Sequence, residues 1–139
     1  MNVPNTRTVV AVVGSSDCAA VVAAATERAA LDAATLVVYA VDAAGAFSSV
    51  RPTWWSAEGQ RAAYGGALTP LQLEMLGEHD LALAVQRARL AGVESYGWLP
   101  TQRGAAGVTR YARDHRPDVL ICGREHAALT EKVAGREVV

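Results

Sequence analysis

Uninterrupted apolar runs divide the chain and predict strands that are buried on both faces. The clearest are 8–14 (TVVAVVG), 35–42 (TLVVYAVD) and 118–123 (DVLICG). Runs of this kind, without polar alternation, are typical of parallel sheets covered by helices on both sides. A further run at 93–100 (VESYGWLP) predicts another strand that is interrupted by glycine and proline, and 136–139 (REVV) predicts a short edge strand.

The segments between these runs favour helices. Ser15, Ser16 and Asp17 can cap an alanine-rich helix that ends near residue 31. Shorter helices are expected at about 105–115 and 126–134.

One long helix is expected between the second and third strands. Thr69 and Pro70 are typical of a helix start, and Gly92 of a helix end. Leucines spaced seven residues apart predict which side of this helix faces the core. Gly77 is expected to weaken the helix only slightly. These leucines are Leu76, Leu83 and Leu90.

The order of elements predicts the fold class. We expect an α/β domain with a single doubly wound, mainly parallel sheet of Rossmann-like type and helices on both faces. Numbering the strands along the chain, the expected order in the sheet is 3-2-1-4-5. The length of 139 residues suits one domain, with a long irregular insertion at 43–69. Trp54, Trp55 and Phe47 in this insertion are either a surface for a partner or a lid over the sheet edge.

Composition narrows the classes of function. A net charge of −1 does not suit a general nucleic-acid binder. No apolar run is long enough to span a membrane, and the first residues do not have the pattern of a signal peptide. Two cysteines make no disulfide framework. We therefore expect a cytoplasmic protein without nucleic-acid or membrane partners.

Candidate binding residues lie where the predicted strands end and helices begin, which is where ligands bind in sheets of this type. Simple helix capping is the alternative for the serines, and an exposed loop position is the alternative for the arginine. The candidate crevice comprises Gly14, Ser15, Ser16, Asp42, Gly104, Gly123, Arg124 and His126.

Cys18, Cys122 and His126 are expected to converge near the same crevice. Cys18 at a helix N-terminus would be a reactive thiolate, and the three side chains could in principle hold a metal. The chain has no CxxC pair, and two buried structural thiols are the favoured interpretation. No arrangement of Ser, His and Asp and no close pair of carboxylates indicates catalysis, so we do not expect an enzyme.

Three segments, in this order, resemble the universal stress protein family. They are VVAVVGSSDCAAVVAAATERAAL, TLVVYAVD and RGAAGVTRYARDHRPDVLICG. The resemblance covers most of the chain and is weak between 43 and 69. The nucleotide-binding branch of that family carries an Asp at the end of the first strand, where this chain has Val13. It also carries Gly-x2-Gly-x9-Gly-Ser/Thr after the fourth strand. Gly123 matches the first glycine, but His126 and Arg136 stand at the other two positions.

These departures make the chain similar to the branch that does not hold nucleotide. Side chains at glycine positions keep phosphate away from the backbone N–H groups. The resemblance implies a homodimer that acts in stress response or growth arrest through an unidentified protein partner, with no retained cofactor. The alternative is a module that binds ATP, AMP or another anion between Gly14 and Gly123.

Overall fold

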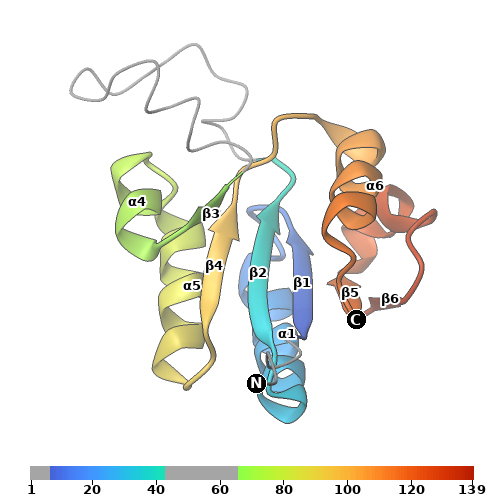
Figure 1. Cartoon of the computed structure of the whole chain (residues 1–139). Helices are drawn as coiled ribbons and strands as arrows, with labels where there is room; N and C mark the ends of the chain where they lie inside the picture. The colour runs from blue at the N-terminus through green and yellow to red at the C-terminus, as the bar shows by residue number, and fades with distance from the viewer. Residues whose placement is uncertain (1–6, 43–65) are drawn as a thin grey trace, which may run out of the picture.

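The computed structural model describes residues 7–42 and 66–139, and the two tryptophans and the phenylalanine of the insertion lie outside these residues. The elements follow the predicted alternation of strands and helices (Figure 1). The strands are β1 (Thr8–Val13), β2 (Thr35–Ala40), β3 (Ala67–Leu68), β4 (Ser95–Trp98), β5 (Val119–Cys122) and β6 (Arg136–Val138). The helices are α1 (Cys18–Asp32), α4 (Pro70–Met75), α5 (His79–Leu90), α6 (Gly104–His115) and the 3-10 helix η1 (Arg124–Thr130).

The strands form one six-stranded sheet in the order β3-β4-β2-β1-β5-β6. The five predicted strands therefore stand in the predicted order, and every pair among them is parallel. β3 was not expected: two residues at the end of the predicted insertion pair antiparallel with β4 and extend the sheet at one edge. So short a strand leaves too little alternation in the sequence to be recognised.

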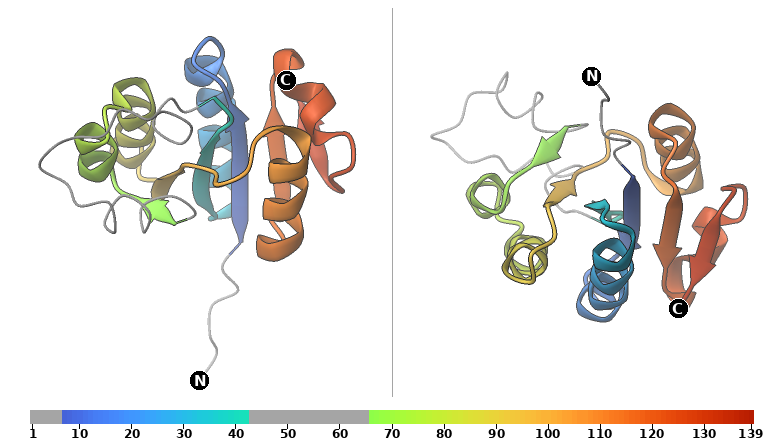
Figure 2. Two further views of the ribbon diagram at one scale, coloured as in Figure 1. Left: turned by 90° about the horizontal axis from the view of Figure 1, so that it is seen from above. Right: turned by 60° about the horizontal axis from the view of Figure 1, so that its bottom comes forward.

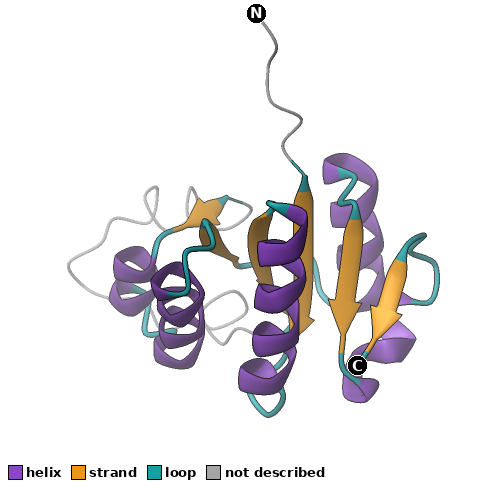
Figure 3. Ribbon diagram, turned by 90° about the horizontal axis from the view of Figure 1, so that it is seen from below, coloured by secondary structure: helices purple, strands orange, loops and turns teal. Residues whose placement is uncertain are grey.

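Helices cover both faces of the sheet, as predicted (Figures 2 and 3). Alternate residues of a strand point to opposite faces. Val9, Ala11 and Val13 therefore pack in one core cluster with residues of α1, α4 and α5. Val10 and Val12 point the other way and pack in a second cluster that includes Val108 and Tyr111 of α6.

The predicted long helix is two helices, so that prediction is wrong. Gly77 lies between α4 and α5 with φ of +80°, a conformation that ends a helix and that only glycine adopts readily. Beyond this break the predicted leucine seam fails, because Leu83 is 49% and Leu90 78% exposed. The core side of α5 is formed by the buried residues Leu81, Ala82, Ala84, Val85 and Ala88.

Two further boundaries differ from expectation. The strand expected at 93–100 is reduced to the four residues of β4. The last helix begins two residues early and is a 3-10 helix. Arg136 stabilises it: its Nη1 donates to Ala127 O at 2.7 Å and to Thr130 Oγ1 at 3.2 Å. None of the helices formed by residues 7–42 and 66–139 is long and apolar enough to cross a membrane.

Candidate functional site

β1 and β5 are neighbours whose carboxyl ends lie at the same edge of the sheet. Gly14 follows β1 and leads to α1, and Gly123 follows β5 and leads to η1. Both glycines are buried. This is the place where sheets of this topology bind ligands, and both loops were predicted as its two sides.

Two side chains fill the space between these loops. His126 Nδ1 lies 3.0 Å from Asp17 Oδ2, and the side chains are only 15% and 13% exposed. Gly14 N donates to the other oxygen of Asp17, Oδ1, at 2.7 Å. The backbone N–H that could face a phosphate is thus already occupied by a carboxylate of the protein itself.

Close packing at both glycines shows how tightly the space is filled. A methyl group on Gly14 would lie 2.7 Å from His126 Cε1, and one on Gly123 would lie 2.9 Å from Asp17 Oδ2. Both distances are shorter than a normal van der Waals contact. The absence of a side chain at these two glycines therefore makes room for the Asp17–His126 pair.

The predicted serines join this loop to acidic partners. Ser15 donates from its backbone N and its Oγ to Asp42 Oδ2, at 3.2 and 3.3 Å. Ser16 Oγ donates to Glu125 Oε2 at 2.5 Å. Helix capping by a side chain, the alternative considered for this loop, is not what the structure shows: Asp17 occupies the N-cap position of α1 without a capping hydrogen bond from its side chain.

The rim of the crevice is acidic. Three carboxylates (Asp17, Asp42 and Glu125) lie around the loop after β1, and they would repel a phosphate or carboxylate ligand. Arg124, the predicted anion ligand, is exposed at the start of η1. Gly104 begins α6, which packs on the opposite face of the sheet from α1, and takes no part in the contacts that join the other candidates.

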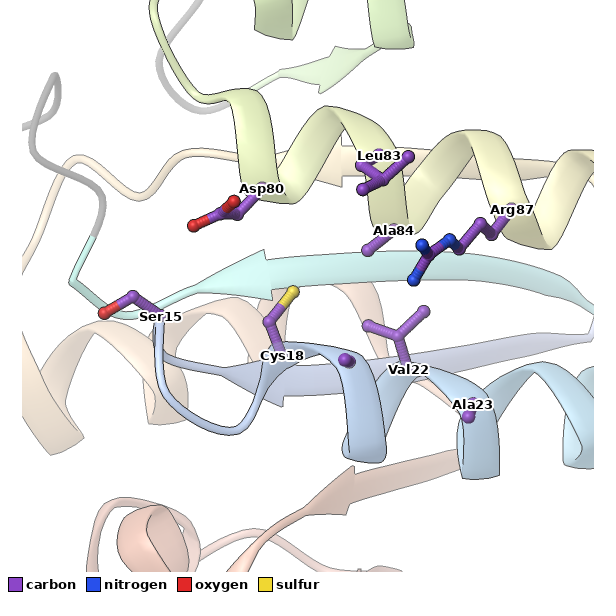
Figure 4. A pocket seen from close by; sticks show the side chains of 9 residues that line it. Ser15, Cys18, Val22, Ala23, Asp80, Leu83, Ala84 and Arg87 are labelled. Carbon is purple, nitrogen blue, oxygen red and sulfur yellow. The ribbon is translucent and has the colours of Figure 1, made fainter.

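At the carboxyl ends of the strands, the side of β1 that faces β2 is open. A cavity of about 350 Å³ is bordered by Gly14, Asp42, Cys18 and the turn between α4 and α5. A groove of about 340 Å³ continues between α1 and α5, with an apolar floor and Asp80 and Arg87 at its two ends (Figure 4). Space for a small molecule therefore exists beside β2 and α5, away from Gly123.

The cysteines do not converge, and both thiols are free and buried, so the favoured interpretation of two buried structural thiols is confirmed. Cys18 belongs to the core cluster on the α1 side of the sheet, whereas Cys122 lies on the α6 side, 3.3 Å from Thr130 Oγ1. Burial, reinforced by the carboxylates of Asp17, Asp80 and Asp42, raises the pKa of Cys18 to about 11. Burial and the nearby carboxylates thus disfavour the thiolate of Cys18, which is the opposite of the effect expected from a helix N-terminus.

Asp17 is the residue that the sequence analysis missed, because it was considered only as a helix cap. Its partner His126 is 109 positions away, and only the pairing of β1 with β5 brings the two together. One local signal existed: each of the two residues follows a strand-ending glycine by three positions, Asp17 after Gly14 and His126 after Gly123.

Comparisons with known proteins identify the fold. No family model matches the chain, and no curated protein matches its sequence. Among solved structures, a universal stress protein from Archaeoglobus fulgidus in complex with dAMP superimposes with a TM-score of 0.58 at 17% identity, covering 99% of this chain and 98% of that one. A member of the universal stress protein family from Burkholderia pseudomallei gives 0.60 at 16%, covering 99% and 98%. A universal stress protein in complex with cAMP gives 0.59 at 18%, covering 96% of each chain. The chain thus shares the fold of the universal stress proteins.

Proposed function

We propose that this chain is a universal-stress-type regulatory domain of the cytoplasm that acts through protein contacts, without retained nucleotide and without catalysis. The observation that carries the proposal is the Asp17–His126 pair, which fills the crevice between the loops after β1 and β5. The universal stress proteins solved with dAMP and cAMP show that this fold can bind nucleotides. The question for this chain is whether its own crevice can.

Physical reasons speak against a phosphate between Gly14 and Gly123. A phosphate bound there would have to displace Asp17 from Gly14 N, and it would then lie among Asp42, Glu125 and Asp17 itself. Phosphate sites at helix N-termini work because free N–H groups and positive charge face the ligand. Here the N–H is occupied and the surrounding charge is negative.

The proposed protein contact is a homodimer formed through β6. This strand lies at the edge of the sheet, and all three of its residues are exposed. Arg28 Nη1 of α1 holds Glu137 of β6 at 2.9 Å from both carboxylate oxygens, which fixes the strand against the body of the domain. An exposed edge strand can pair with the same strand of a second copy.

Mass spectrometry of small molecules released from the freshly purified, denatured protein tests the nucleotide part of the proposal. We expect no adenine nucleotide to be released. Calorimetric titration of the protein with ATP and AMP should show no binding, and an Asp17→Ala/His126→Ala variant shows whether emptying the crevice restores it. Stoichiometric nucleotide in the unaltered protein would refute the proposal.

An ATP, AMP or anion-binding module is the second candidate. It is favoured by the cavity of about 350 Å³ beside Gly14 and Asp42, which the Asp17–His126 pair does not fill. Binding that is lost in an Asp42→Ala variant and kept in Asp17→Ala would establish this second function.

A further inference from the structure

The side chains that close the crevice are also the donors of a small metal site. Asp17, Glu125 and His126 each offer one ligand atom, and these atoms all lie within 4.8 Å of one another. Among the residues that the structure describes, they form the one such group of three or more. We propose that this triad binds a divalent transition-metal ion, for which Zn²⁺ is the best match.

The geometry of the triad is close to that of a bound state. Two ligands that share one Zn²⁺ at about 2.0–2.2 Å lie roughly 3 Å or a little more apart. His126 Nδ1 and Asp17 Oδ2 already stand 3.0 Å apart. Glu125 is exposed, and its ligand atom already lies within 4.8 Å of those of Asp17 and His126, so only small side-chain movements would be needed to bring all three to one ion.

Outer hydrogen bonds orient the two carboxylates. Gly14 N donates to Asp17 Oδ1, which leaves Oδ2 directed toward His126. Ser16 Oγ donates to Glu125. Metal sites depend on outer partners of this kind, which hold ligands in place before the ion arrives. The closely packed Gly123 has a role as well, since a methyl group there would displace the Asp17 carboxylate.

The donor set selects the class of ion. One imidazole and two carboxylates suit borderline divalent ions such as Zn²⁺, whereas Mg²⁺ and Ca²⁺ prefer oxygen ligands alone. The positive end of α1 opposes a cation, but two carboxylates in contact with the ion outweigh a partial charge of about one half. Three protein ligands leave a coordination position for water or for a group from a partner.

This inference rests on the proposed function in one respect, namely that nucleotide phosphate does not occupy the crevice. The inference goes beyond the proposed function because it assigns to the crevice a cation, whereas a nucleotide phosphate is an anion. A metal would tie the loop after β1 to the first residues of η1, which are now joined by side-chain hydrogen bonds.

The inference is tested by titrating the full chain, without a tag and after EDTA treatment, with Zn²⁺. Calorimetry measures the binding, and the melting temperature reports stabilisation by the ion. Co²⁺ absorption reports the ligand set. We expect one ion per chain and a raised melting temperature. The exposed Glu125→Gln should weaken binding at least tenfold with the apo protein still folded, and His126→Gln should do the same. Glu74→Gln is the matched control, because Glu74 pairs with His79 on the surface and no third ligand joins them among residues 7–42 and 66–139; this variant should bind Zn²⁺ as the unaltered protein does.

Absence of Zn²⁺ binding, or binding that both Glu125→Gln and His126→Gln leave unchanged, would overturn the inference. A parallel titration with ATP separates this failure from failure of the proposed function. ATP binding to the metal-free protein contradicts the proposed function whatever Zn²⁺ does. ATP binding only to the Zn²⁺-loaded protein contradicts the proposed function and leaves the metal site established.

Discussion

The two sides of β1 at the carboxyl edge of the sheet differ in one respect that matters for ligands. Between β1 and β5 the space is filled by the Asp17–His126 pair. Between β1, β2 and α5 there is a cavity of about 350 Å³ and a groove that continues from it. The fold is continuous across both sides, so closure depends on two side chains and not on the backbone. A chain can therefore keep the fold of the universal stress proteins while side chains fill the space on one side of β1.

The largest effect should be seen at Cys18, which borders the open side. With its pKa raised from 9.0 to about 11, the fraction of thiolate at pH 8 falls about a hundredfold. We expect iodoacetamide to label Cys18 in the native protein about a hundred times more slowly than in the urea-unfolded protein, as followed by peptide mass spectrometry. Comparable rates in the two states would mean that the open side exposes this thiol.

Removing one carboxylate from the filled side of β1 and one from the open side should change the free energy of unfolding by different amounts. Asp17→Ala leaves Gly14 N without its acceptor and His126 without its partner in a partly buried position, so we expect a loss of about 1–3 kcal/mol in the free energy of unfolding. Asp42 is exposed, and Asp42→Ala should change stability by no more than about 0.5 kcal/mol. Urea denaturation measures both, and equal losses would contradict the distinction between a closed and an open side.

Gly14→Ala tests whether the closed side is as tightly filled as the distances indicate. The added methyl group would meet His126 Cε1 at 2.7 Å, and overpacking of this kind costs about 1–3 kcal/mol. The loss should be well below that in a His126→Ala background, because the obstructing ring is gone. If the loss in the free energy of unfolding is as large in the His126→Ala background, the strain lies in the backbone of the loop instead.

Of the two glycine substitutions, Gly77→Ala should have the smaller effect, at the turn that borders the open cavity. A methyl group there meets no atom within 4 Å, so only the positive φ of +80° is unfavourable. A non-glycine residue in this conformation costs about 1–2 kcal/mol. Because no atom of the described residues lies near the added methyl group, the cost should be the same in a Leu81→Val background, and a strong dependence on that background would contradict this account.

Much of the fold follows from local patterns in the sequence. The β-branched runs of β1, β2 and β5 require cover on both faces, and the alternation with helices then leads to a parallel sheet in the predicted order. Gly14 and Gly123 mark the strand ends, so the position of the crevice was also predictable. The break at Gly77 was not, because a glycine within a helical pattern can either be tolerated or end the helix, and packing decides which.

The sequence by itself determined the sheet, its order and the place of the crevice, since these depend on hydrophobic periodicity and on residues that end strands and start helices. Only the tertiary structure decided what the crevice contains. Asp17 and His126 are 109 positions apart, and no local pattern specifies that their side chains meet at 3.0 Å. The separation of Cys18 from Cys122 was decided in the same way, because β5 carries Cys122 on the opposite face of the sheet from α1. Contacts between distant segments depend on strand register and side-chain direction, which are settled only when the whole core packs.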